Sequence, residues 1–331
     1  MSHRRSLRRF AAMHETYRRF AQEKLHPWLA EHTAEGYFES SDQLNIHYHE
    51  AINPEEQASI VIVHGFCEFF GKYHETAYRF YEAGYSVFFL ELRGHGKSDR
   101  KREFEDQRVI VDSFEEYVDD IHAFLEKVVI PHSLTKKLFL FAHSMGGAAA
   151  AMYIEKYPDA FRCAVLSSPM LKVDYGGIPD PAIDALAVAT RIGDLGDKFA
   201  PGQHEWRGED LFLKSSCMDR DRYDYQFEQR MQDVHYQTWG GTWAWAAAAK
   251  KATESALNNA HCVDIPVLIC QAGHDGMVDN EGQNEFRRLS NMVYLIRYDG
   301  AEHELFNADA YTRKKYYTDV LNYFKIFTLV V

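Results

Sequence analysis

The sequence predicts an α/β protein, in which a mainly parallel sheet is covered by helices on both faces. Three observations support this fold class. From residue 59 onward, short β-rich runs alternate with amphipathic helical segments. Residues 60–63 form a continuous β-branched run, as expected for a strand that is buried on both sides. Apolar residues between positions 114 and 128 recur at spacings of three and four, which is typical of a helix.

The elements follow in order along the chain. Residues 44–52 alternate weakly and suit an antiparallel edge strand. The run 59–63 predicts the next strand, a helix is predicted near 73–82, and the helix near 114–128 is expected to end before Pro131. Further strands are predicted at residues 85–90, 137–142, 163–167, 266–271 and 292–297, and a last helix at 308–327.

The alternation of strands and helices breaks between Pro169 and His261. This stretch is irregular, leans towards helix and contains four of the five tryptophans. The strand pattern resumes afterwards, so the stretch is interpreted as an insertion between two core strands. The predicted organisation is an N-terminal basic amphipathic helix (1–35), a core (36–168 and 262–331) and a helical cap (169–261).

Composition excludes several classes of protein. The net charge of −12 argues against a nucleic-acid partner. The five cysteines are odd in number and never form Cys-x-x-Cys, which indicates reduced thiols and neither a disulfide framework nor a zinc site. No run of 18 apolar residues occurs, and no apolar run follows the basic start, so we expect neither a membrane span nor secretion, and a cytoplasmic location.

The first 30 residues differ from the rest, because seven Arg and Lys residues stand against two Glu residues, a charge of +5. Apolar and aromatic residues fall at helical spacing there: Leu7, Phe10, Ala11, His14 and Tyr17. One interpretation is a helix docked on the domain by its apolar stripe. The other is a basic amphipathic helix on an anionic membrane surface, with the protein peripheral to the inner face. The sequence leaves both open.

The most informative stretch is residues 139–148, in which an apolar strand runs into Ser144 and a helix rich in small residues follows. A sharp strand-to-helix turn of this kind lifts a nucleophilic serine clear of the sheet. The turn needs small residues two positions before and after the serine, here Ala142 and Gly146. The alternative is a serine that only caps the following helix.

Acyl transfer through a serine needs two backbone N–H groups that stabilise the oxyanion. Met145 supplies the first by its position after the serine. Phe66 is the second candidate, because His64-Gly65-Phe66 directly follows the strand at 59–63. Taken alone, His64-Gly65 is also compatible with an ordinary turn.

The order serine, acid, histidine predicts an acid after a late strand and a histidine after the next one. Asp275 follows the strand at 266–271, and His303 follows the strand at 292–297. The histidine would take the serine proton and the carboxylate would fix its tautomer. Position favours His303, since it is one of seventeen histidines. Asp279 is the rival acid, but it suits the cap of a helix that starts near Asn280.

Two further features are weighed and set aside. Residues 93–98 resemble the end of a phosphate-binding Gly-Lys-Ser loop, but Glu91 stands where the first glycine is needed, and the glycines suit a tight turn after the strand at 85–90. Glu68 lies near the oxyanion loop, where it would either contact a substrate hydroxyl or simply cap a turn.

On these motifs, the sequence resembles the α/β-hydrolase group that holds bacterial lysophospholipases and monoacylglycerol lipases. The resemblance covers the core from about residue 36 to the end and rests on residues 64–68, 92–98, 117–120, 142–147 and 300–304. It implies an α/β-hydrolase fold and a serine esterase that acts on lipids with one acyl chain, without metal or cofactor. One departure is Asp275, where some relatives have glutamate; either carboxylate can orient the histidine.

We therefore expect a small-molecule lipid ester as substrate, with its acyl chain under the cap. The cap aromatics that would line an acyl channel are Trp206, Phe212, Tyr223, Tyr225, Phe227, Trp239, Trp243 and Trp245. One rival is an aminopeptidase or amidase on the same fold, with an acidic cap residue that holds the substrate amine. The candidate acids are Glu205, Glu209, Asp210, Asp219 and Asp221. The other rival is a non-catalytic acyl-binding module.

Overall fold

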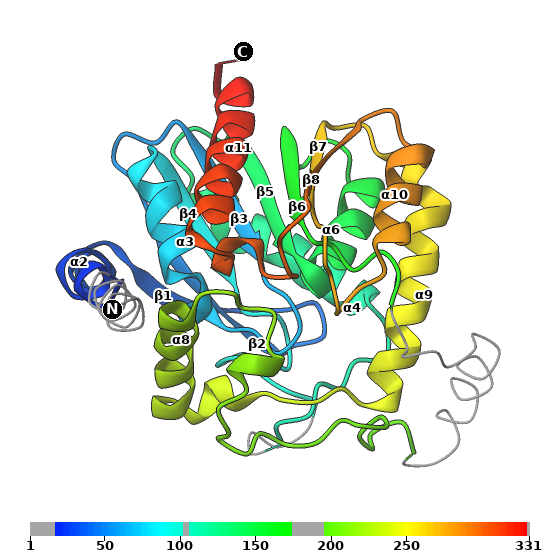
Figure 1. The fold of residues 1–331 in the computed structure, drawn as a ribbon. Helices are drawn as coiled ribbons and strands as arrows, with labels where there is room; N and C mark the ends of the chain where they lie inside the picture. The colour runs from blue at the N-terminus through cyan, green and yellow to red at the C-terminus, as the bar shows by residue number, and fades with distance from the viewer. Residues whose placement is uncertain (1–16, 102–105, 174–194, 330–331) are drawn as a thin grey trace.

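The computed structural model describes residues 17–101, 106–173 and 195–329. Within them, eight strands form one sheet in the order β1-β2-β4-β3-β5-β6-β7-β8 (Figure 1). β1 and β2 pair antiparallel, as do β2 and β4, and every other neighbouring pair is parallel. The strands are β1 (Ala34–Glu39), β2 (Asn45–Ala51), β3 (Ala58–Val63), β4 (Tyr85–Leu90), β5 (Leu138–His143), β6 (Cys163–Ser167), β7 (Val267–Ala272) and β8 (Val293–Tyr298).

Every strand predicted from the sequence is present to within two residues at each end. One strand, β1, was not predicted. It begins at Ala34, inside the range 1–35 that was expected to form the N-terminal helix. Only Phe38 of this strand is buried. An edge strand with one buried residue shows no alternation of apolar and polar residues in its sequence. It is recognised as a strand only by its hydrogen bonds to β2.

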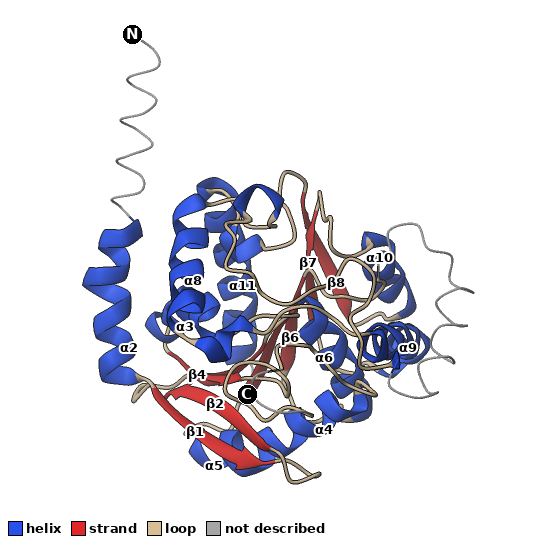
Figure 2. Ribbon diagram, turned by 90° about the horizontal axis from the view of Figure 1, so that it is seen from below, coloured by secondary structure: helices blue, strands red, loops and turns tan. Residues whose placement is uncertain are grey.

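Helices cover both faces of the sheet, and further helical segments pack outside these two layers (Figure 2). Their bounds are η1 (Ala21–Leu25), α2 (His26–His32), α3 (Phe70–Glu82), α4 (Glu115–Phe124), η2 (Leu125–Val129), α5 (Ile130–His132), α6 (Ser144–Lys156), η4 (Phe212–Lys214), α8 (Arg220–Gln232), η5 (Val234–Gln237), α9 (Trp243–Asn259), η6 (Ala260–Cys262), α10 (Asn280–Leu289), η7 (Leu305–Asn307) and α11 (Ala310–Leu329). Figure 2 shows α3 and α11 on one side of the sheet and α6, α9 and α10 on the other.

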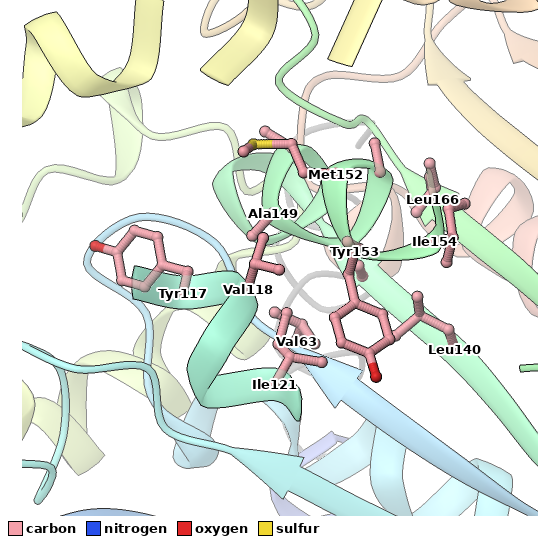
Figure 3. Close-up of a cluster of buried hydrophobic side chains, with 14 of the residues drawn as sticks. Val63, Tyr117, Val118, Ile121, Leu140, Ala149, Met152, Tyr153, Ile154 and Leu166 are labelled. Atoms are coloured by element: carbon pink, nitrogen blue, oxygen red, sulfur yellow. The ribbon is translucent and has the colours of Figure 1, made fainter. Parts of the chain in front are cut away.

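Alternate residues of the central strands feed the two cores. Val61 and Val63 of β3 pack with α4, α6 and α9, whereas Ile60 and Ile62 pack with α3 and α11. Figure 3 shows the first core, in which Val118 and Ile121 of α4 approach α6 over Val63 and Leu140. Because β3 to β7 are buried along their whole length, the sheet is a fixed platform for the loops at its carboxyl edge.

The sequence predicted that the helix beginning at α4 ends before Pro131, and this prediction is wrong. The helix continues through the π-helical turn η2 into α5, with Pro131 at the first positions of α5. The π turn changes the hydrogen-bond register, and proline, which has no N–H to donate, stands where a new helical segment begins. Pro27 takes the same place in α2, directly after the π turn η1.

The described part of the N-terminal helix docks on the domain by one stripe. Tyr17, Ala21 and Leu25 are buried and pack near Tyr78 of α3 and Tyr225 of α8. The Tyr17 and Tyr225 rings meet edge to face at 5.8 Å. Leu7, Phe10, Ala11 and His14, which the stripe was also expected to include, lie outside the described residues.

Between β6 and β7 the described chain crosses from α8 to α9 (Figure 1). α9 lies in the range expected to form the cap, but its buried alanines pack with α6 in the core. Residues 174–194 of the expected cap lie outside the described residues. The limits of a lid therefore stay a prediction.

All five cysteines are free thiols; Cys262 is exposed and the others are buried. No helix within the described ranges is long and apolar enough to cross a membrane.

Candidate active site

Ser144 stands between β5 and α6 at the carboxyl edge of the sheet, with an unusual backbone. Its φ is +52°, in the left-handed region that a non-glycine residue seldom adopts. The turn is tightly packed and needs glycine at position 146, because a Cβ there would lie 2.3 Å from the carbonyl oxygen of His64. The first turn of α6 is therefore pressed against the loop after β3, which brings Met145 and Phe66 to the same place.

Asp275 and His303 come together from the next two loops of the same edge. His303 Nδ1 lies 2.7 Å from Asp275 Oδ2, and Asp275 Oδ1 accepts hydrogen bonds from the amides of Met277 (2.9 Å) and Val278 (3.1 Å). Burial disfavours the charged carboxylate, but the hydrogen bond and electrostatic interaction with His303, together with these two amides, hold the pKa of Asp275 below its ordinary value.

Close packing of the two loops produces this pair. A Cβ on Gly273 would lie 2.4 Å from the carbonyl oxygen of Asp299, so the loops after β7 and β8 are in backbone contact. His303 in turn lies beside the residue that precedes Ser144, because the His303 and His143 rings are 4.8 Å apart. Ser144 and the His303–Asp275 pair thus lie in loops at the same edge of the sheet.

Asp279 does not take part in this arrangement. Its side chain accepts a hydrogen bond from the Glu281 amide at 2.9 Å and caps α10, and it pairs with Lys172 at 2.6 Å. The structure therefore brings Asp275, and not its rival, to His303.

Phe66 N–H donates no hydrogen bond to any residue within 17–101, 106–173 or 195–329. The loop that presents it is held by Glu68, whose Oε2 accepts from the Gly65 amide at 2.5 Å and from the Tyr73 hydroxyl at 2.5 Å. Of the two interpretations of Glu68, the structural one matches these contacts. A donor that is fixed and unpaired is what an oxyanion site requires.

A buried charge network lies under this loop, and sequence reasoning missed it. Lys72 Nζ lies 2.6 Å from Glu68 Oε1 and 2.8 Å from Glu304 Oε1. Burial alone would disfavour all these charges, but the lysine holds the pKa of Glu68 well below its usual range, and the two glutamates raise the pKa of Lys72. His143 Nε2 is 3.6 Å from Glu68, yet burial lowers the pKa of His143 to about 4, so the ring is neutral at pH 7. The only sequence signal was that Glu304 directly follows His303.

The loop after β4, which resembles a phosphate-binding loop, has a structural role. Gly94 and Gly96 both have positive φ, as a tight turn requires. Arg93 donates to both oxygens of Asp120, at 2.6 and 2.7 Å, and so joins this loop to α4.

A cavity of about 400 Å³ lies among the loops at the carboxyl edge of the sheet, and Ser144, Asp275 and His303 do not themselves line it. Phe66, Met277 and Glu304, which line it, are close in sequence to the oxyanion loop, Asp275 and His303. Of the cap aromatics named from the sequence, those that line it are Trp206, Tyr223, Phe227 and Trp239. Trp245 does not line the cavity but packs on Phe66, with the two ring centroids 4.4 Å apart. Tyr225 packs on Tyr17 of the N-terminal helix.

One group of described residues could hold a metal ion, namely Glu35, His47 and His49, whose ligand atoms lie within 4.8 Å of one another. It lies on β1 and β2, away from Ser144. Lys97 Nζ contacts both oxygens of Glu35, at 2.8 and 2.9 Å, and His47 Nδ1 contacts Glu91 at 2.9 Å. These charges already have partners, and the chemistry of Ser144 does not draw on them.

Residues 54–309 match the family model described as serine aminopeptidase, S33. The chain belongs to this family of α/β hydrolases. The assignment confirms the α/β-hydrolase fold that the resemblance and the alternation of strands and helices predicted, and it identifies the chain as a serine hydrolase.

Two relatives are similar over most of this chain and most of their own length. Lysophospholipase L2 of Escherichia coli K12 is 29% identical over 70% of this chain and 67% of its own length. A monoacylglycerol lipase of Mycolicibacterium smegmatis is 30% identical over 75% of this chain and 81% of its own. Among solved structures, the monoacylglycerol lipase of Paleococcus ferrophilus superposes with a TM-score of 0.66 at 24% identity, covering 85% of this chain and 99% of that one, which supports the fold.

Proposed function

We propose that this hydrolase cleaves esters of lipids with a single acyl chain, such as lysophospholipids or monoacylglycerols. The observation that carries the proposal is the His303–Asp275 hydrogen bond at the same edge of the sheet as Ser144, whose backbone is strained. An aromatic cavity lined by Phe66, Met277 and Glu304 lies in the adjoining loops. The relatives named lysophospholipase and monoacylglycerol lipase support the lipid substrate.

In the proposed mechanism, Ser144 attacks the ester carbonyl while His303 takes its proton. The amides of Phe66 and Met145 stabilise the oxyanion, and Asp275 holds the His303 tautomer and stabilises the imidazolium. His303 then protonates the departing alcohol. In the second step, His303 activates a water that hydrolyses the acyl-enzyme and releases the fatty acid.

The cavity favours an ester over the peptide substrate that the family's name suggests. An aminopeptidase needs an acid that holds the substrate amine, but none of Glu205, Glu209, Asp210, Asp219 and Asp221 lines the cavity. Asp210 pairs with Arg220, and Asp219 with Arg222 and Arg313. Glu304 lines the cavity but is already bound by Lys72 and by Asn307.

Hydrolysis of p-nitrophenyl butyrate, p-nitrophenyl octanoate and an aminoacyl-anilide tests this function. Ser144→Ala should lower kcat by roughly 10⁶-fold with the fold intact, whereas Ser255→Ala, near the C-terminal end of α9, should retain the activity. If the cavity binds the acyl chain, kcat/KM should rise by up to about 100-fold from butyrate to octanoate, because each buried CH₂ contributes about 0.8 kcal/mol. A Ser144→Ala enzyme within tenfold of wild type, or a preference for the anilide, would contradict the proposal.

Contact of residues 1–30 with an anionic membrane remains a separate proposal, supported by their charge of +5. Tyr17, Ala21 and Leu25 already pack against the domain, so the stripe is not available over that stretch. A chain without residues 1–16 should keep its activity on soluble esters and stop binding vesicles that contain anionic lipid. Unchanged vesicle binding would leave the helix with a docking role alone.

A further inference from the structure

Arg230, on α8, differs from the other buried arginines of the described chain. Arg93 is paired with Asp120, and Arg313 with Asp219. Arg230 is equally buried, with 9% of its surface exposed, yet no carboxylate contacts it among the described residues. A buried guanidinium without an anion costs free energy, and burial accordingly lowers the pKa of Arg230.

The surroundings of Arg230 hold its guanidinium in one place. The ring centroids of Phe69, Trp206 and Trp239 lie 5.0 to 5.1 Å from the guanidinium carbon. One donor, Nη2, is used by the carbonyl oxygen of Cys67 at 2.6 Å. The other donors have no acceptor within the described residues, and Arg230 lines the 400 Å³ cavity. A planar donor that is fixed, charged and only partly used suits a phosphate group.

The balance of charge in the cavity also points to an anion. Its lining holds three Lys and Arg residues, Lys72, Lys214 and Arg230, together with His204 and one acid, Glu304. Glu304 and the adjacent Glu68 are both engaged by Lys72, so the charges left without a carboxylate partner are those of Arg230 and Lys214. A neutral substrate would leave the Arg230 charge uncompensated.

Arg230 also contacts the proposed oxyanion loop. It binds the carbonyl of Cys67, the residue directly after Phe66, whose amide is the proposed oxyanion donor. In a 1-acyl glycerophospholipid, only the three carbons of glycerol separate the ester oxygen from the phosphate oxygen. A lipid whose carbonyl lies at Phe66 can therefore bring its phosphate to Arg230.

We propose that Arg230 binds the phosphodiester of a lysophospholipid and so selects this class over monoacylglycerols. The inference rests on the proposed function, since it assigns a headgroup to the same site. Arg230 is a specificity-determining residue here and takes no part in the acyl transfer.

The test compares lysophosphatidylcholine with a monoacylglycerol of the same short acyl chain. Arg230→Gln is the informative variant, because an amide can still donate to the Cys67 carbonyl while the charge is removed. We expect kcat/KM for the lysophospholipid to fall by about 10- to 100-fold, mainly through KM, while that for the monoacylglycerol changes less than threefold. Arg230→Lys should restore part of the difference. The control is Arg220→Gln, on the same helix and paired with Asp210 and Asp224, which should change neither substrate.

Glycerophosphocholine and inorganic phosphate, tested as inhibitors of monoacylglycerol hydrolysis, distinguish a lipid headgroup from free phosphate. Inhibition of the wild type by glycerophosphocholine that is lost in Arg230→Gln supports the proposal. Equal losses on both lipids would assign Arg230 only to holding the oxyanion loop, and inhibition by inorganic phosphate alone would assign a free-phosphate site; either result overturns the inference.

A binding measurement separates this inference from the proposed function. Lysophosphatidylcholine should bind the Ser144→Ala protein more tightly than the monoacylglycerol does, and Arg230→Gln in that background should remove the difference. A wild type that cleaves neither lipid would defeat the proposed function, while the binding comparison would still decide the role of Arg230. Equal binding of the two lipids would overturn the inference even in an active enzyme.

Discussion

The two oxygens of Asp275 have separate tasks. Oδ2 lies at His303 Nδ1, and Oδ1 is held by the amides of Met277 and Val278. Asp275→Asn keeps the shape and the loop contact but presents an amide to the imidazole, which favours the wrong tautomer. We expect kcat for ester hydrolysis to fall on the order of 10⁴-fold. Asp279→Asn is the matched control, because it weakens only the cap of α10 and the Lys172 pair, and its kcat should stay within tenfold. A larger loss in Asp279→Asn than in Asp275→Asn would reverse our assignment of the acid.

Sequence reasoning at this scale pointed to Ser144, Asp275 and His303 because each follows an apolar strand, and parallel strands end at one edge of a sheet. It could not find Arg230 or the Lys72 network. Lys72 and Glu304 are 232 positions apart, and no local pattern marks two charges that meet only after folding.

At the scale of elements, the N-terminal helix is held on the domain by the buried side chains of one face. Leu25 is fully buried in η1, whereas its neighbour Lys24 is exposed. Leu25→Ala should lower the free energy of unfolding by about 2–5 kcal/mol, because it leaves a cavity between this helix and the domain. Lys24→Ala should change that free energy by less than about 0.5 kcal/mol. Urea unfolding of both variants makes the comparison, and equal effects would mean that the helix detaches without cost to the domain.

The sequence predicted the described strands well, since buried parallel strands are continuous apolar runs, but it ended the helical stretch from α4 to α5 too early and omitted β1. Both errors arise from packing. Proline is tolerated after a π turn that a neighbouring layer supports, and β1 exists because the β2 edge offers it hydrogen bonds.

For the whole molecule, buried histidines set the acid limit of stability. Burial lowers the pKa of His74 to about 3 and that of His143 to about 4, against about 6.5 in an unfolded chain. The unfolded state therefore binds more protons below pH 6.5, and stability falls as the pH drops from 6.5 towards these folded values. Between pH 7 and pH 5 each of the two histidines should remove about 2 kcal/mol from the free energy of unfolding.

Urea titrations at pH 7 and pH 5 measure this loss. His74→Gln, which can still hydrogen-bond the Tyr225 hydroxyl, should reduce the difference between the two pH values by about one histidine's share. Carboxylates with lowered pKa, such as Asp275, lose their contribution only below about pH 4, so they do not affect this window. A His74→Gln protein with an unchanged pH dependence would show that His74 already titrates normally in the folded state.

The sequence by itself determined the alternation of strands and helices, the turn at Ser144 and the order in which acid and histidine follow. Each of these features can be recognised in a short segment, because a hydrophobic period, the small residues of a turn, or the residue after a strand each span about ten residues or fewer. Only the tertiary structure decided that Glu68, Lys72 and Glu304 share one network, that the Tyr17–Leu25 stripe faces α3 and α8, and that Arg230 is left without a counter-charge beside the cavity. Whether a buried charge is compensated depends on which side chains pack around it, and that is fixed only when distant segments meet.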